Sequence, residues 1–264
     1  MKIGFLGCGN MGGALCRAAR RADADSVLLL ADADSKKRDL LSEEVRGESV
    51  SNEVLFASAD LIFLGLKPQV LPSVLAQYEG EISASHATFV SMAAGLSLET
   101  LSAHLGHHAL IRMMPNTAVA VGAGMIVYTP APTCGKEEEA AFLLAMSAAG
   151  CCLKIREGLM DAACAVSGCG PAFVYLFLEA LADGGVECGL PRDMALTLAA
   201  ETLEGAARMV KETGIHPATL KDAVCSPGGS TIAGVHALES FGLRAAAMNA
   251  VLASYQRTKE LSKG

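Results

Sequence analysis

The sequence contains no tryptophan, and aromatic residues make up only 5% of its 264 residues. Charged residues are also few, at 19%, and acidic side chains outnumber basic ones to give a formal net charge of -7. The densest basic run is Lys36-Lys37-Arg38. Because nucleic-acid phosphates are bound by basic surfaces, this composition argues against a nucleic-acid partner.

Long hydrophobic runs are missing as well. The most apolar runs, residues 61–66 and 140–149, are far shorter than the roughly 20 residues of a membrane-spanning helix. The chain passes from Lys2 directly into an apolar run and a glycine loop, unlike a signal peptide. We therefore expect a cytoplasmic protein without a membrane segment.

Cys-x-x-Cys pairs are absent, although the sequence has nine cysteines. An odd number without a pairing motif favours reduced, mostly buried thiols of a cytosolic protein, with Cys134 on a loop. His104, His107 and His108 cluster, but no cysteine or carboxylate stands at ligand spacing from them. We therefore expect a solvated helix end or turn there and no metal.

The first half of the chain alternates short apolar runs with helical patterns. Strands are predicted at residues 2–6, 26–31, 60–66, 88–92, 109–113, 124–128 and 152–155. Helices are predicted at residues 11–21, 36–46, 70–78, 97–105 and 137–149. Runs such as Leu61-Ile62-Phe63-Leu64 are apolar throughout, as in strands covered on both faces. The alternation predicts an α/β fold with a Rossmann-type, doubly wound parallel sheet.

The strand pattern stops after about residue 157. Helices are predicted at residues 171–185, 191–213, 217–224, 230–241 and 243–263, several of them opening at a proline. We therefore expect a dinucleotide-binding domain over residues 1–157 and an all-α domain over residues 158–264. Five apolar helices exceed what one small domain can cover, which predicts a homodimer through the second domain and leaves higher assembly open.

Gly7, Gly9 and Gly12 lie between the first predicted strand and the first predicted helix. This context favours a pyrophosphate-binding loop over an ordinary strand–helix turn. Asp32 lies 20 residues after Gly12, where a carboxylate commonly binds the adenosine ribose. The basic run 36–38 follows and could neutralise the 2′-phosphate of NADPH, so NADPH and NADH both stay open.

Three further predicted strands end in turns at Lys67-Pro68, Met92-Ala93-Ala94-Gly95 and Met113-Met114-Pro115-Asn116. Each turn alone is an ordinary strand-to-loop transition. Because the carboxyl ends of parallel strands meet at one sheet edge, the three together predict a ligand cleft.

Two glycine-containing segments precede helices of the second domain. Ser167-Gly168-Cys169-Gly170-Pro171-Ala172 is compatible with helix capping or with close approach of the backbone to a ligand. Ser226-Pro227-Gly228-Gly229-Ser230-Thr231 contains a good N-cap serine, but its two glycines exceed what capping needs. They suit a nest of N–H groups that binds a carboxylate.

Together these motifs resemble the pyrroline-5-carboxylate reductase family along essentially the whole chain. The blocks at residues 167–172 and 226–231 carry most of the specificity. The resemblance implies a Rossmann domain followed by a helical dimerisation domain. It also implies reduction of 1-pyrroline-5-carboxylate to L-proline, with hydride transfer from NADPH or NADH to the imine carbon.

The resemblance further implies the site residues. The cofactor-binding residues would be Leu6, Gly7, Cys8, Gly9, Asn10, Met11, Asp32, Asn52, Gly65, Leu66, Lys67, Pro68, Met92, Ala93, Ala94 and Asn116. The substrate-binding residues would be Glu157, Gly228, Gly229, Ser230 and Thr231, with Thr231 as the catalytic residue. The chain departs from the family at Cys169, often serine, at Ser230, often alanine or threonine, and at Ala223, asparagine in some members.

Two other functions compete with this interpretation. A β-hydroxyacid dehydrogenase of the 6-phosphogluconate type shares the architecture but uses a lysine where Val174 stands here. A non-catalytic dinucleotide sensor would not need the pocket at residues 226–231.

Overall fold

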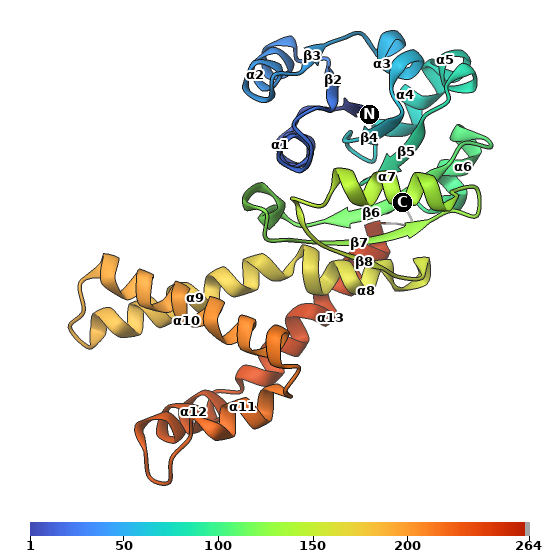
Figure 1. Ribbon diagram of the computed structural model, residues 1–264. Helices are drawn as coiled ribbons and strands as arrows, with labels where there is room; N and C mark the ends of the chain where they lie inside the picture. Colours follow the sequence, from blue (N-terminus) through green and yellow to red (C-terminus); the bar gives the residue numbers. More distant parts are fainter. Residues whose placement is uncertain (262–264) are drawn as a thin grey trace. The chain divides into compact units, whose positions relative to one another are not determined.

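The computed structural model describes residues 1–261, which form two compact units (Figure 1). The first unit comprises Met1–Cys169 together with the chain from Ser254 onward, and the second comprises Gly170–Ala253. Compact units and functional domains need not end at the same residue, so the division after residue 157 stays a prediction.

The first unit contains an eight-stranded sheet with the strand order β3-β2-β1-β4-β5-β6-β7-β8. The strands are β1 (Lys2–Leu6), β2 (Val27–Ala31), β3 (Glu48–Ser49), β4 (Leu61–Leu64), β5 (Thr88–Ser91), β6 (Leu110–Pro115), β7 (Gly124–Pro130) and β8 (Gly150–Lys154). β1 to β6 run parallel, and the order reverses at β1. This confirms the Rossmann-type sheet and places its switch point beside the glycine loop that follows β1.

The last two strands depart from the predicted parallel sheet. β7 pairs antiparallel with β6, and β8 pairs parallel with β7. A parallel connection needs a crossover of about a dozen or more residues. Only residues 116–123, which contain the short helix η1 (Thr117–Val121), join β6 to β7. The parallel prediction is therefore wrong for this edge of the sheet.

Helices cover both faces of this sheet. α1 (Asn10–Ala22), α2 (Ser35–Val45) and α7 (Lys136–Ala145) share one core cluster with Phe5 and Phe63. α3 (Asn52–Ser58), α4 (Leu71–Gln77), α5 (Glu79–Ala84) and α6 (Leu98–Leu105) share the other with Ile62 and Leu64. All four residues of β4 are completely buried, which confirms the prediction from its unbroken apolar run. The sequence patterns did not indicate β3, α3 or α5, which are too short to show a period.

The second unit is all-α, as predicted. Before it, residues 157–168 of the first unit form three short helical segments, η2 (Glu157–Leu159), α8 (Met160–Ala163) and the π-helical η3 (Cys164–Gly168). The longer helices that follow are α9 (Gly170–Glu187), α10 (Arg192–Thr213), α11 (Pro217–Ala223), α12 (Ser230–Ser240) and α13 (Leu243–Leu261). The predicted end of the last helix, at residue 263, lies outside the described residues.

The second unit buries little apolar surface within the chain. Its core cluster consists of Ala182, Ala195 and Ala199, whereas Leu176 and Met248 are each 67% exposed. The helical stretch Glu157–Glu187 is long and apolar enough to span a membrane by length and composition alone, with a mean hydropathy of 1.5. The search of the sequence for long apolar runs did not detect this stretch, because its glycines divide it into shorter runs.

Candidate cofactor and substrate site

The loop between β1 and α1 is tight and needs glycine at positions 7 and 12. Gly7 has a φ of +102°, and a Cβ on Gly12 would lie 2.0 Å from the Gly7 carbonyl oxygen. Gly9 is the N-cap of α1, makes no side-chain capping bond and has open space around its Cα. The first N–H groups of α1 therefore stand uncapped beside an open surface, which fits a pyrophosphate.

Asp32 directly follows β2 and is tied to the glycine loop. Its Oδ2 accepts a hydrogen bond from the Cys8 N–H at 2.6 Å, and its Oδ1 accepts one from the Asp34 N–H at 2.8 Å. A carboxylate has about four acceptor sites, so two remain for ribose hydroxyls. Asp32 thus stands where the sequence predicted it and also holds the loop, a role that the motif did not indicate.

The basic run after Asp32 is partly neutralised by its own neighbours. The Lys37 Nζ lies 3.2 Å from Asp34 Oδ2, and the Arg38 Nε lies 2.8 Å from Asp39 Oδ1. Lys37 is largely exposed, whereas Arg38 is half-buried. These pairs leave less positive charge for a 2′-phosphate than the sequence alone indicates.

The turns after β4 and β5 contain the next predicted cofactor residues. Gly65 donates its N–H to the Leu6 carbonyl at 2.8 Å, so the turn that continues through Leu66, Lys67 and Pro68 begins against the glycine loop. Ala93 is buried, and its N–H donates to the Ser91 hydroxyl. Met92 is partly buried and Ala94 is exposed, while Asn52 is the half-buried first residue of α3. Their contacts with a cofactor stay predictions.

Asn116, which follows β6, uses its amide inside the protein. The Oδ1 accepts from the Ala118 and Met125 N–H groups at 3.2 and 3.1 Å, and the Nδ2 donates to the Ser167 carbonyl at 3.0 Å. Its side chain thereby links the end of β6 to β7 and to the first glycine-containing block. Its cofactor role stays a prediction.

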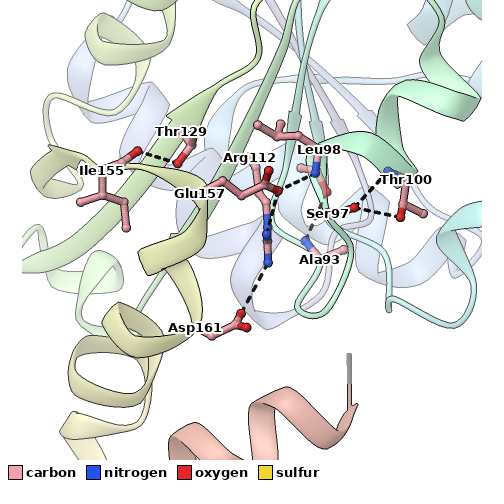
Figure 2. A network of polar contacts seen from close by, with 10 residues as sticks. Ala93, Ser97, Leu98, Thr100, Arg112, Thr129, Ile155, Glu157 and Asp161 are labelled. Carbon is pink, nitrogen blue, oxygen red and sulfur yellow. Dashed lines mark hydrogen bonds and ion pairs between the residues drawn. The ribbon is translucent and has the colours of Figure 1, made fainter. Parts of the chain in front are cut away.

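Glu157 lies in a network with Arg112 that Figure 2 shows from close by. Arg112, on β6, has a side chain only 7% exposed, and its Nη1 donates to Glu157 Oε1 at 3.0 Å. The same oxygen accepts the Leu98 N–H, the first of α6, at 2.6 Å. Asp161 Oδ1 lies 3.8 Å from the Arg112 Nη2. The sequence reading missed Arg112 and Asp161, although a lone arginine within an apolar strand signals a buried charge that needs partners.

The glycine-rich segment before α12 has an uncapped helix start. The N-cap is Gly229, not the predicted serine, and no side chain caps the helix. Gly228 has a φ of +70°, and a Cβ on Gly229 would lie 2.4 Å from the Ser226 Oγ. Ser230 and Thr231 are exposed in the first turn. The Gly229 N–H donates to the Ser226 carbonyl at 3.0 Å, so the first N–H groups of α12 are the ones left for an anion, and the carboxylate nest stays a prediction.

The nine cysteines form no disulfide within the described residues. Burial raises the pKa of the Cys8 and Cys16 thiols to about 12, which keeps both protonated. Cys134 is half-buried on the loop before α7, as predicted. Cys151 and Cys188 are exposed, so the prediction of mostly buried thiols is wrong for them.

The histidine cluster lies at the end of α6 and in the turn after it, as predicted, and His107 is exposed there, but the prediction of a solvated site is wrong for His108. His108 is buried against the ring of Phe89, and His107 stacks on it at 4.9 Å between ring centroids. Burial lowers the pKa of His108. Among the residues that the structure describes, no group of three or more metal-binding side chains is brought together.

Comparison with known proteins identifies both parts of the chain. Residues 157–261 match the family model for pyrroline-5-carboxylate reductase dimerisation, and residues 2–95 match the model described as NADP oxidoreductase, coenzyme F420-dependent. Pyrroline-5-carboxylate reductase of Methanosarcina acetivorans is 42% identical, with 99% of this chain and 98% of that protein covered. The corresponding protein of Arabidopsis thaliana is 41% identical, over 99% and 96%.

A solved structure agrees over the same length. The Plasmodium falciparum pyrroline carboxylate reductase with NADP bound has a TM-score of 0.86 and 31% identity, and the match covers 99% of this chain and 98% of that one. Relatives above 40% identity along the full length exclude the β-hydroxyacid dehydrogenase family. The chain belongs to the pyrroline-5-carboxylate reductase family.

Proposed function

We propose that this chain reduces 1-pyrroline-5-carboxylate to L-proline with NADPH or NADH. The observation that carries the proposal is the presence, in a chain of this family, of two uncapped glycine-rich helix starts. The start of α1 suits a pyrophosphate, and the start of α12 suits a small carboxylate.

The residues of the first unit fit a dinucleotide, because the cradle of Gly7 and Gly12 excludes side chains and leaves space over Gly9. The loop at residues 6–11 would hold the pyrophosphate, and Asp32 and Asn52 the adenosine ribose. Residues 65–68 and 92–94 would line the nicotinamide half, and Asn116 would complete the set. When bound, the cofactor supplies the hydride.

Residues 228–231 would hold the substrate carboxylate and ring nitrogen. Within residues 228–230, the N–H groups of Gly228 and Ser230 would bind the carboxylate, because that of Gly229 donates to the Ser226 carbonyl. The Thr231 hydroxyl would hydrogen-bond the ring nitrogen and help hold a proton there. Hydride addition at the imine carbon then turns the protonated C=N bond into the secondary amine of proline. Because the imine nitrogen is already protonated, no lysine or histidine base is required, and orientation is the main contribution of the protein.

We also propose a homodimer through residues 158–264, with residues 1–157 as the dinucleotide-binding domain. The support is the match to the dimerisation model and the exposed apolar side chains of α9 and α13. Assembly of dimers into larger particles, a cytoplasmic location, and the absence of nucleic-acid and membrane partners are parts of the same proposal.

The most direct experiment follows cofactor oxidation by the loss of absorbance of the reduced nicotinamide. Purified chain should oxidise NADPH and NADH only when 1-pyrroline-5-carboxylate is present, and should form L-proline in equal amount. It should not reduce either oxidised cofactor with 3-hydroxy acids. A folded protein that binds the cofactor but is inert with the imine would support the sensor and overturn the proposal.

Thr231→Val tests the predicted catalytic hydroxyl. Because the N-cap is Gly229, the substitution should change the free energy of unfolding by no more than about 0.5 kcal/mol. Loss of a transition-state hydrogen bond worth about 1–3 kcal/mol should lower kcat roughly ten- to a hundredfold. Thr202→Val, which removes an exposed hydroxyl on α10, is the matched control. Normal kcat and KM in T231V would remove this hydroxyl from the mechanism.

A further inference from the structure

The guanidinium of Arg112 lies inside the first unit, and its side-chain partners among the described residues are carboxylates. Arg112 sits in the middle of β6, where it pairs with Ser91 of β5 and Thr129 of β7. Its Nε is buried and has no hydrogen-bond partner among the described residues. A buried arginine left unpaired is strongly destabilising. Glu157 and Asp161, both from the segment after β8, supply the compensating charge.

Two donors converge on one oxygen of Glu157. The Arg112 Nη1 and the Leu98 N–H both donate to Oε1, at 3.0 and 2.6 Å. No hydrogen bond within the described part of the chain uses Oε2, and the side chain is 33% exposed. The two bonds fix the plane and position of the carboxylate, and they leave its second oxygen available to a ligand.

The same contacts connect the predicted nicotinamide loop with the start of the dimerisation segment. Leu98 begins α6, directly after the turn that contains residues 92–95, and residue 157 is the first residue of the dimerisation match. A shift of the Arg112 guanidinium would therefore move the Glu157 carboxylate relative to this turn.

We infer that Arg112 is a positioning residue, which holds Glu157 so that its free oxygen accepts the N–H of the protonated imine and of the proline product. The inference rests on the proposed function. Asp161 has a lesser part, because its 3.8 Å separation from Arg112 exceeds a hydrogen bond. Leu98 contributes only its backbone.

The principal test is a double-substitution cycle between Arg112→Lys and Glu157→Gln. Lysine keeps a positive charge between the carboxylates but lacks the planar fork that fixes Oε1. Glutamine keeps one oxygen for both donors and replaces the other oxygen by an NH2 group, which cannot accept. Each single variant should raise the KM for the imine about ten- to a hundredfold, because a hydrogen bond to a charged group is lost or misplaced. The KM for NADPH should change less than twofold.

The cycle separates positioning from a merely structural role. If Arg112 acts through Glu157, adding R112K to E157Q should raise the KM for the imine by less than a further threefold. Fully multiplicative effects, or equal losses for the imine and for NADPH, would overturn the inference. Arg17→Lys is the control. It alters a two-bond pair with Glu44 on the surface of the same unit, and it should leave the two KM values within twofold.

A second variant keeps the test decisive if R112K does not fold. Glu157→Asp retains the charge but shortens the side chain by one carbon. The carboxylate therefore cannot accept from both Arg112 and Leu98 while its second oxygen stays in the same position. E157D should raise the KM for the imine as E157Q does, and an unchanged KM would overturn the inference.

Calorimetric titration of L-proline into the protein with NADP+ gives a readout besides turnover. The same variants should weaken proline binding and leave NADP+ binding unchanged. Absence of imine reduction in the unmodified chain would instead refute the proposed function.

Discussion

Adding one methyl group at Gly9 should weaken cofactor binding without disturbing the fold. Gly9 has a φ of -67° and a ψ of -171°, a region open to alanine, and nothing lies within 4 Å of the position a Cβ would take. Alanine is a poorer N-cap than glycine, at a cost of about 0.5–1 kcal/mol. It also lowers the conformational entropy of the unfolded chain, which stabilises the folded protein by about 0.4–1 kcal/mol. The free energy of unfolding of Gly9→Ala should therefore stay within about 1 kcal/mol of the parent.

Gly12→Ala is the contrasting substitution. Its Cβ would lie 2.0 Å from the Gly7 carbonyl oxygen, and the obstacle is backbone, not a flexible side chain. Because alanine has the higher helix propensity, a glycine-to-alanine change inside a helix stabilises the fold by about 1 kcal/mol. The forced separation of α1 from β1 should cost more than this, since overpacking costs about 1–3 kcal/mol. Gly80→Ala, on α5 with open space, is the matched control and should be neutral or stabilising.

The assay combines urea unfolding of the cofactor-free protein with steady-state kinetics. In Gly9→Ala the KM for NADPH should rise at least tenfold with stability retained, because the methyl group occupies the space through which a phosphate reaches the N–H groups of α1. In Gly12→Ala both stability and cofactor affinity should fall. An unchanged cofactor KM in Gly9→Ala would show that no phosphate passes over this loop, and the cofactor assignment would fail with it.

Asp32→Ser should raise kcat/KM for NADPH relative to NADH, because the charge that repels the 2′-phosphate is removed; equal changes for both cofactors would show that Asp32 does not contact the ribose. The same variant should lose about 1–3 kcal/mol of stability, since the Cys8 N–H loses its acceptor. Unfolding free energy should also fall above pH 9, because the thiols of Cys8 and Cys16 ionise in the unfolded chain before they do so in the fold, where burial raises each pKa to about 12. At pH 10 each thiol should contribute a loss of about 1 kcal/mol, and Cys16→Ala should remove one such contribution from the pH dependence in urea titrations. Sedimentation at micromolar concentration should show a dimer, and a fully active monomer would contradict the proposed interface.

Much of the first unit could be predicted from the sequence because its strands are short apolar runs with helices between them. The antiparallel direction of β7 could not be predicted, because strand direction depends on the length and path of the connection from β6. The apolar pattern of β7 is the same as that of its parallel neighbours. The glycine loop was predicted by its context, but the tether from Asp32 to Cys8 joins residues 24 apart and has no local signature. Arg112 is a sharper case. Its place in an apolar strand indicates a buried charge, yet its partner follows 45 residues later.

The second unit raises the question of what covers its apolar helices. By composition alone, the stretch that ends in α9 could enter a membrane. However, α9 packs on α10 through Ala182, Ala195 and Ala199, and α10 carries seven charged residues. Charged side chains at the centre of a bilayer cost about 2.5–3.5 kcal/mol each on an insertion scale. If α9 entered lipid, either α10 would have to enter with it or the contacts of α9 with α10, which form the apolar core of the second unit, would be lost. A second copy can cover the exposed face of α9 and leave the charges of α10 in water, so we expect protein and not lipid on this surface.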